Sequence, residues 1–137
     1  MDSSSELQAI IRNWFESVYR NDASWLDRHL STDGRLRIIG TDPEEWLQGD
    51  KAAELLRSDL AALGGKATFE VSEAEAFTEG SIGWGAASLT ITLEGGMKVS
   101  PRWSAVFHQE DGQWKAVQVH ASVGLTNEQL FGTSFST

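Results

Sequence analysis

The sequence has no cysteine among its 137 residues. This absence excludes disulfides, thiolate nucleophiles and thiolate metal sites together. Basic residues are also few, since 11 Lys and Arg stand against 20 Asp and Glu and give a net charge of −9. Binding to nucleic acid or to an anionic lipid surface requires a basic patch, so we expect neither partner.

Long apolar runs are absent as well, because none approaches the roughly 18 residues that a membrane-spanning helix needs. The first residues, MDSSSEL, are acidic and polar and do not have the layout of a signal peptide. We therefore expect a cytoplasmic protein with no membrane partner. No histidine pair has metal-ligand spacing, and no phosphate-binding glycine loop or dinucleotide motif is present, so we expect no metal and no cofactor.

Tryptophan is the residue type present in excess, with six against a single tyrosine. The indole ring is bulky and its N–H usually needs a partner, so this number indicates a lined cavity or a broad interface in addition to core packing. The length suits one domain with one core, which we expect to span residues 1–137.

Helical periodicity dominates the first part of the chain. Ser3 and Glu6 form a possible capping box, and the apolar residues between positions 7 and 18 recur at helical spacing, which predicts a long first helix. Asp22 then has the character of an N-cap, and it predicts a short second helix with Trp25, Leu26 and Leu30 turned inward.

The next segment predicts one short strand and one further helix. Residues 36–39 are typical of a strand. In the sequence GTDPEEWLQG, Asp42 and Glu45 are explained by capping of one compact helical turn, which would present Trp46 from a loop. Asp50 then caps a third helix that ends at Gly64 and Gly65.

The second half of the chain predicts strands at residues 67–77, 82–93 and 99–124, followed by one helical turn. Gly83 and Gly85 indicate that something bulky approaches this part of the sheet closely. Helices followed by a run of antiparallel strands predict an α+β fold. If the sheet curls and three helices close its concave side, the result is a cone with an apolar interior.

Residues 99–124 contain Asp111-Gly112 between two apolar arms, which is a strong hairpin signal. A two-residue turn would pair Trp103 with His120, whereas a three-residue loop with a bulge at Gly112 would pair Arg102 with His120. We favour the bulged register because it gathers the apolar residues on one face. That face carries Trp103, Ala105, Phe107, Val117, Val119, Ala121 and Val123. The other face carries Arg102, Ser104, Val106, His108, Trp114, Ala116, Gln118, His120 and Ser122.

Three stretches, IIGTDPEEWLQG, DGQWKAVQVHAS and VGLTNEQLFG, resemble the nuclear transport factor 2-like superfamily, in particular its SnoaL-like branch. The resemblance covers nearly the whole chain. It implies a cone-shaped fold of the NTF2-like or cystatin-like type, with a curved antiparallel sheet wrapped around three N-terminal helices. The superfamily includes isomerases, cyclases, dehydratases and assembly domains, so the fold does not settle the function.

Two family sites are tested by position. Ketosteroid isomerases of this superfamily use a Tyr on the first helix, an Asp base at the first strand and a second Asp on the strand before the last. In this sequence Trp14 stands at the position of the Tyr and Ile38 at that of the base. The strand before the last, within residues 98–109, contains no carboxylate. Without this base and these donors, the residues do not support a ketosteroid isomerase. The arginine positions of the kinase association domains correspond to Ala105 and Ala121, so the resemblance implies an apolar pocket.

The reading that we favour is a homodimeric domain that binds a small apolar or aromatic molecule. Trp46 would act as a lid and Trp84 and Trp103 would line the wall, although plain core packing explains these residues equally well. The full set of candidate ligand-binding residues is Trp14, Trp46, Trp84, Trp103, Phe107 and Val119.

His120 decides between the alternatives. The favoured register places it on the convex face, where we expect it at the contact of a homodimer. Alternatively, the protein is an isomerase, dehydratase or hydrolase with His120 as base and Arg102 or Tyr19 as helper, which requires His120 to turn inward. A third reading is a structural dimerisation module, for which we expect a cone filled by its own side chains.

Overall fold

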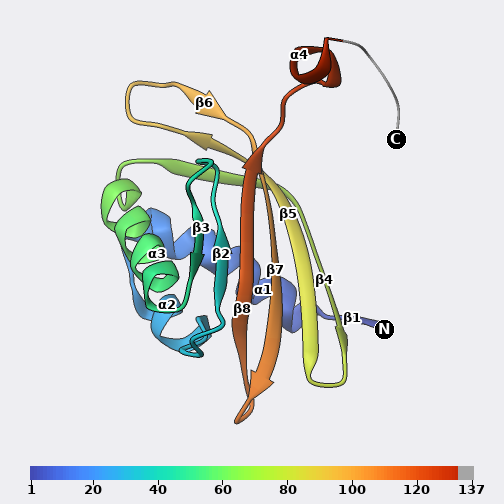
Figure 1. The fold of residues 1–137 in the computed structure, drawn as a ribbon. Coiled ribbons are helices and arrows are strands. Elements are labelled where there is room, and N and C mark those ends of the chain that lie inside the picture. The colour runs from blue at the N-terminus through green and yellow to red at the C-terminus, as the bar shows by residue number, and fades with distance from the viewer. Residues whose placement is uncertain (133–137) are drawn as a thin grey trace.

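The computed structural model describes residues 1–132 (Figure 1). It has the expected α+β architecture, in which a curved, open sheet is covered on its inner face by helices from the first half of the chain. These helices are α1 (Ser5–Arg20), α2 (Ser24–His29) and α3 (Asp50–Leu63). None of the helices in residues 1–132 is long and apolar enough to cross a membrane.

The pattern of apolar residues explains why residues 5–20 form helix α1. Its buried side chains are Leu7, Ile11, Trp14, Phe15 and Val18, as the spacing predicts. The N-cap is Ser4, whose hydroxyl accepts the N–H of Leu7 at 3.0 Å, so the predicted capping box beginning at Ser3 is wrong by one residue. The helix ends at Asn21, which adopts a left-handed conformation with φ of 55°.

The predicted caps of the next two helices are also displaced. Ala23 is the N-cap of α2, while the Asp22 carboxylate accepts the N–H of Ser24 at 2.9 Å, just before the helix. Gly49 with φ of 63° is the N-cap of α3, and Asp50 is the first helical residue. A carboxylate in a first helical turn is stabilised by the helix dipole, so Asp50 still favours the start of this helix.

In the part of the chain that the structure describes, the sheet contains seven strands in one hydrogen-bonded path and an eighth beside it. The order is β1 (Asp2–Ser3), β4 (Thr68–Glu79), β5 (Ile82–Thr92), β7 (Pro101–Glu110), β8 (Gln113–Val123), β2 (Arg37–Ile39) and β3 (Trp46–Gln48), and β6 (Lys98–Val99) pairs with β5. The prediction of an antiparallel sheet is wrong at one place, because β2 runs parallel to β8. β2 reaches the sheet after two helices, so no hairpin forces it to be antiparallel.

The segment between β2 and β3 is a turn and not the predicted helical turn. The Asp42 carboxylate accepts the N–H of Glu44 at 2.9 Å, and the chain then reverses so that Trp46 pairs with Ile39. Asp followed by Pro starts a tight turn as readily as a helix. Trp46 therefore begins strand β3, and the prediction that it stands on a loop is wrong.

The β7–β8 hairpin differs from both predicted registers. Asp111 and Gly112 have φ of 50° and 79°, as a two-residue turn of type I′ requires. The bulge lies within the paired strands instead of at the turn: Phe107 pairs with Ala116, and Val106 pairs with Gln118. Val117 is the extra residue of this bulge.

The bulge changes which side chains are buried. Trp114 and Ala116, predicted on the outer face, are buried on the inner face beside Phe107. Beyond the bulge His120 lies opposite Ser104, not opposite Arg102, although it remains on the outer face as predicted. Successive side chains of a strand point to opposite faces of the sheet. One extra residue therefore reverses which face each side chain occupies on one side of the bulge.

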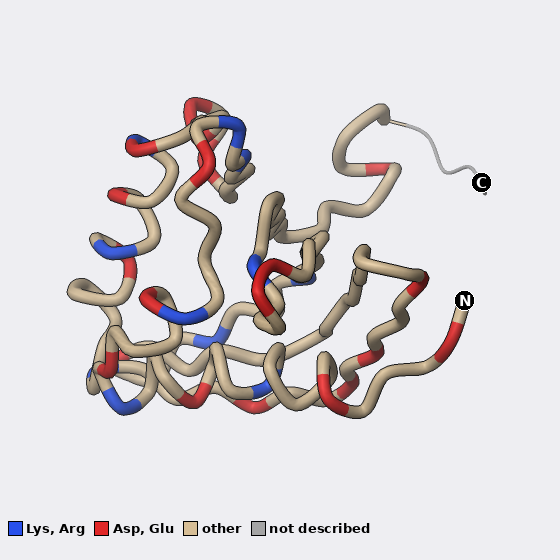
Figure 2. The backbone as a smooth tube through the Cα atoms, turned by 90° about the horizontal axis from the view of Figure 1, so that it is seen from below, with Lys and Arg blue, Asp and Glu red and all other residues tan. Residues whose placement is uncertain are grey.

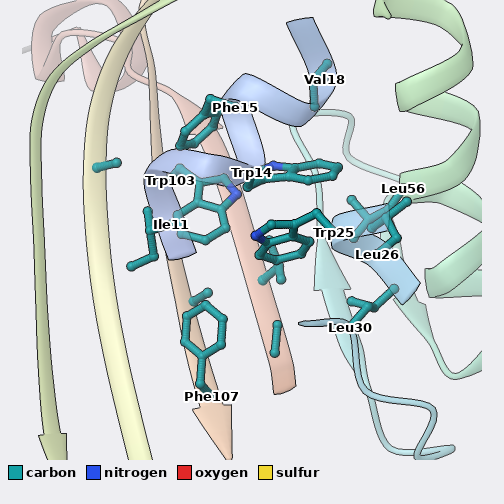
Figure 3. Packing of buried hydrophobic residues seen from close by; sticks show 14 of the residues in the cluster. Ile11, Trp14, Phe15, Val18, Trp25, Leu26, Leu30, Leu56, Trp103 and Phe107 are labelled. Carbon is teal, nitrogen blue, oxygen red and sulfur yellow. The ribbon is translucent and has the colours of Figure 1, made fainter. Parts of the chain in front are cut away.

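The core lies where α1 crosses the inner face of the sheet (Figure 3). The rings of Trp14 and Trp25 are 5.0 Å apart, and Phe15 meets Trp103 edge-on at 5.5 Å. A Cβ on Gly83 would lie 2.6 Å from Leu7, and one on Gly85 2.3 Å from Ile11. The close approach that these glycines predict is confirmed, and the bulky element is α1.

The predicted C-terminal helical turn is present as α4 (Asn127–Phe131), which stands away from the sheet and helices (Figure 1).

Along the helices, positions of Lys and Arg are interspersed with Asp and Glu (Figure 2). Some of these form exposed ion pairs, such as Arg57 with Asp27 at 2.9 Å.

Candidate functional site

An apolar cavity with a volume of about 370 Å³ lies between α1, α3 and the inner face of the sheet. Trp14 from α1 and Trp103 from β7 line it, and Leu56 and Leu63 contribute one side from α3. The strands supply mainly β-branched and Leu side chains, because the inward positions of β5 and β8 are apolar. The cavity is therefore a mostly hydrophobic space held between well-packed elements.

The cavity reaches the end of the sheet that lies farthest from the Asp111–Gly112 turn. Its lining includes Leu93, Val99, Pro101 and Val123, which stand at the ends of their strands near β6. On the other side of this end, the lining continues into residues 39–41, where β2 ends. The open end of the cone is thus bordered by strand ends and by the turn between β2 and β3.

Few polar side chains lie on this lining. Within residues 1–132 they are, apart from the indole groups, Thr41, Glu45 and Asp59, and none of the lining residues in that range is basic. Asp59 comes from α3, one helical turn from Leu55 and from Leu63, so all three lie in one row along the helix.

Glu45 is fixed by the turn that carries it. Its Oε1 atom accepts the backbone N–H of Asp42 at 3.0 Å. Gly40 makes room for this arrangement, because a Cβ there would lie 2.4 Å from the same Oε1 atom. The turn therefore holds one carboxyl group at the rim of the cavity.

The carboxyl group of Asp59 has a pKa above its ordinary value. Partial burial of its carboxyl group, and secondarily the negative charge of Glu45, raise the pKa of Asp59 to about 6. By its surface area, however, the residue as a whole is exposed to solvent. Asp59 thus changes its charge near neutral pH, and a shifted titratable group in an apolar cavity is typical of functional sites.

Sequence reasoning missed Asp59. An acidic residue on an amphipathic helix is usually solvated, and nothing in its neighbourhood forms a motif. The available signal was its spacing, because position 59 lies four residues from Leu55 and four from Leu63, in the apolar row. The sequence explains Glu45 by helix capping, whereas in the structure its side chain closes a turn and also lines the cavity.

Of the six residues predicted to bind a ligand, Trp14, Trp103 and Val119 lie on the cavity lining. Phe107 is fully buried in the core and lies outside the lining. The remaining two, Trp46 and Trp84, do not lie on this lining.

Trp84 and Trp46 do not lie where the sequence predicts. Gly83 and Gly85 face α1, so Trp84 between them faces outward, with its ring 6.2 Å from that of Phe77. The prediction that Trp84 lines the wall is therefore wrong. Trp46 is 63% exposed on β3, where the Arg37 guanidinium lies 4.5 Å from its ring, and it is not part of the cavity lining.

The candidate catalytic residues do not converge on the cavity. His120 and Arg102 lie on the outer face, where they border a shallow hollow of about 380 Å³ together with Glu73 and Glu75. Arg102 donates to the hydroxyl of Ser122 at 3.3 Å. Tyr19 is 52% exposed and borders a different hollow beside α1. His120 therefore cannot exchange a proton with a molecule in the cone.

The remaining histidines have structural surroundings. His29 places Nδ1 2.9 Å from the carbonyl oxygen of Trp114, and burial lowers its pKa. His108 lies 3.3 Å from a carboxylate oxygen of Glu110. Within residues 1–132, no group of three or more His, Cys, Asp or Glu residues is arranged to hold a metal ion.

The curved sheet and the three helices that cover it form a fold of the NTF2-like type. The family model of the SnoaL-like domain matches residues 7–126, and the chain belongs to this family. No curated protein matches the chain.

Solved structures extend the likeness in fold. An NTF2-like protein of unknown function from Pseudomonas putida KT2440 is 14% identical, with a TM-score of 0.76 over 91% of this chain and 89% of that one. A proposed dehydratase of the NTF2-like family from Streptomyces avermitilis is 19% identical, with a TM-score of 0.72 over 88% and 95%. The association domain of C. elegans CaMKII is 15% identical, with a TM-score of 0.67 over 86% and 93%. At these identities the likeness concerns the fold alone.

Proposed function

We propose that this protein, as a single domain spanning residues 1–137, binds a small, largely apolar or aromatic molecule in the cone. The observation that carries the proposal is the cavity of about 370 Å³ between α1, α3 and the sheet. Its volume falls within the roughly 300–1,000 Å³ that is typical of small-molecule sites. A cone that served only as a scaffold for dimerisation would be filled by its own side chains.

The character of the lining supports an aromatic or aliphatic occupant. Trp14 and Trp103 offer two large ring surfaces, and Trp103 is held by its edge-on contact with Phe15. Rings that are fixed by packing bind an apolar partner without losing much side-chain entropy. Burial of apolar surface would supply most of the affinity.

The outer face of the sheet supports a homodimer as the working form. Ala86, Trp84 and Val106 form an apolar area there, bordering a hollow. Glu75 and Arg102 lie on the same face with opposite charges. In a two-fold contact one patch meets its own copy, so such charges can pair across the interface. A chain without cysteine needs no oxidising compartment, and we propose that the dimer works in the cytoplasm.

A second candidate function is favoured by Asp59. Its carboxyl group lies on the cavity lining and titrates near neutral pH, which suits a general acid or base. The protein would then be a small-substrate isomerase or dehydratase with Asp59, not His120, moving the proton. For such an enzyme, Asp59→Asn would abolish turnover of a substrate that it still binds.

The experiment begins with native mass spectrometry of the protein as purified from its own cells. A dimer that carries a reproducible small additional mass supports the proposal and supplies the ligand. In parallel, isothermal titration with the neutral probe 4-phenylbutan-1-ol tests whether the cone accepts an apolar molecule at all.

Two variants on adjacent residues locate the binding. Val123 lines the open end of the cavity, whereas its neighbour Ser122 lies on the outer face. We expect Val123→Trp to block the probe and Ser122→Trp to leave its affinity unchanged. Equal affinity in both variants, or no binding of the probe to the wild type, would overturn the proposal.

A further inference from the structure

The chemistry of the open end goes beyond a merely apolar site. Among the described residues that line the cavity, Asp59 and Glu45 are the only ionisable side chains, and both are acidic. Within residues 1–132, no side chain donates a hydrogen bond to Asp59 or forms an ion pair with it. A carboxyl group in this position has acceptor capacity that the protein itself leaves unused.

The surroundings hold this carboxyl group in place. Its neighbours on α3, Leu55 and Leu63, pack toward the cavity and fix the row of the helix on which Asp59 lies. Opposite, Glu45 is held by the N–H of Asp42. The two acidic groups therefore face the same space from two different elements.

This arrangement selects among possible occupants by charge. Two like charges beside an apolar space repel each other, and none of the lining residues that the structure describes is basic and could compensate them. A cationic group on the occupant would relieve the repulsion, whereas a carboxylate or phosphate would add to it. The apolar wall requires that the rest of the occupant be hydrophobic.

We propose that Asp59 is the specificity-determining residue of the cavity and that the occupant is an apolar molecule carrying a protonated amine, held at the open end by Asp59 with Glu45 beside it. This inference rests on the proposed small-molecule function and names its ligand class. The amine lies at the rim, where it keeps contact with water, and the hydrophobic body extends toward Trp14 and Trp103.

The acidity of Asp59 adds a dependence on pH. Since its pKa is raised to about 6, the carboxyl group is mostly neutral at pH 5 and mostly ionised at pH 7.5. Glu45, from the turn between β2 and β3, is the other titratable group on the lining, and neither α1 nor the sheet contributes one. Affinity for an amine therefore rises with pH through this window.

Three probes with one skeleton test the proposal at pH 7.5 by isothermal titration. They are 4-phenylbutylamine, 4-phenylbutan-1-ol and 4-phenylbutanoate, which differ only in a cationic, neutral or anionic end. We expect the amine to bind about tenfold more tightly than the alcohol, the scale of one charge-assisted hydrogen bond. The carboxylate binds most weakly, and the preference for the amine shrinks at pH 5.

Variants assign the preference to its residue. Asp59→Asn keeps the shape of the side chain and should bring the amine to the affinity of the alcohol, while Glu45→Gln should reduce the preference partly. Glu54→Gln, on the exposed side of α3, is the matched control and should change nothing. Circular dichroism of each variant verifies that it is folded.

The outcomes separate this inference from the function on which it rests. If the alcohol binds but the amine binds no more tightly, or if Asp59→Asn keeps the preference, the assignment of Asp59 is wrong and the apolar site stands. If the wild type binds none of the three probes, the small-molecule site and the inference both fail.

Discussion

Ile11 of α1 lies directly over Gly85 of β5, at a distance that leaves no room for a side chain on the strand. A Cβ at Gly85 would come within 2.3 Å of Ile11 Cδ1 and within 2.5 Å of the Glu75 carbonyl oxygen. The second of these atoms belongs to the backbone of β4 and cannot move aside. The glycine therefore determines how closely α1 packs on the sheet.

We expect Gly85→Ala to lower the free energy of unfolding by about 2 kcal/mol, because the added methyl overpacks a tight contact. Urea denaturation followed by tryptophan fluorescence measures the loss. Gly34→Ala is the control, since a Cβ there meets nothing within 4 Å and its cost should be close to zero. Equal stability of the two variants would contradict the tight packing of α1.

The turn of the β7–β8 hairpin provides a second test. Gly112 has φ of 79° and open space around it, so replacement by Ala meets no clash and only the backbone conformation opposes it. We expect Gly112→Ala to cost about 1 kcal/mol. Asp111→Asn should be neutral, because Asn also tolerates a left-handed conformation. A neutral Gly112→Ala would argue for a different turn.

The hairpin also explains what the sequence could predict and what it could not. The two arms and the Asp-Gly turn were recognisable, but the position of the bulge was not, because it depends on which side chains the sheet buries. A signal exists: the inward-facing apolar residues fall at 114 and 116 before the bulge and at 119 and 121 after it, so the apolar phase shifts. Without the position of the bulge, the sequence predicts the wrong face for Trp114.

The candidate site was predictable only in part. Trp14, Trp103 and Val119 follow from inward-facing apolar patterns, which a sequence displays. Trp84 could not be placed, because the glycines beside it, and not its own bulk, decide which face meets α1. The pKa of Asp59 is raised first by partial burial in the folded protein and second by Glu45, which is distant in the sequence and is brought near by the turn before β3.

Asp59 predicts a dependence of stability on pH. An acid whose pKa is raised by folding binds its proton more tightly in the folded state. Between its ordinary value of 3.8 and about 6, the folded protein therefore holds more protons than the unfolded chain, and the free energy of unfolding falls as pH rises.

In Asp59→Asn this contribution disappears. We expect the variant to be more stable than the wild type at pH 7.5 by about 1 kcal/mol, a value reduced because the side chain is partly exposed and screened by water. At pH 4, close to the ordinary pKa of 3.8, the difference should be much smaller. Urea denaturation at both pH values measures it, and a difference that is independent of pH would exclude an effect of ionisation.

The proposed homodimer is tested at the centre of the outer face. Ala86 borders both hollows there, so Ala86→Arg would bring two arginines close to each other across a two-fold contact. We expect the variant to be monomeric in analytical ultracentrifugation at concentrations where the wild type is a dimer. Ala62→Arg, on the exposed side of α3, should remain dimeric. A dimeric Ala86→Arg would place the contact elsewhere.

Trp103 provides the most direct test of the apolar lining. It contributes a fixed ring to the cavity, so Trp103→Ala should weaken binding of 4-phenylbutan-1-ol by about 2 kcal/mol, the scale of an anchor residue at an interface. Because this change also opens the core, Trp103→Phe is measured beside it and should show a smaller loss. Trp84→Ala removes an indole from the outer face and should leave the affinity unchanged. If Trp84→Ala weakened the probe as strongly as Trp103→Ala, the molecule would bind outside the cone.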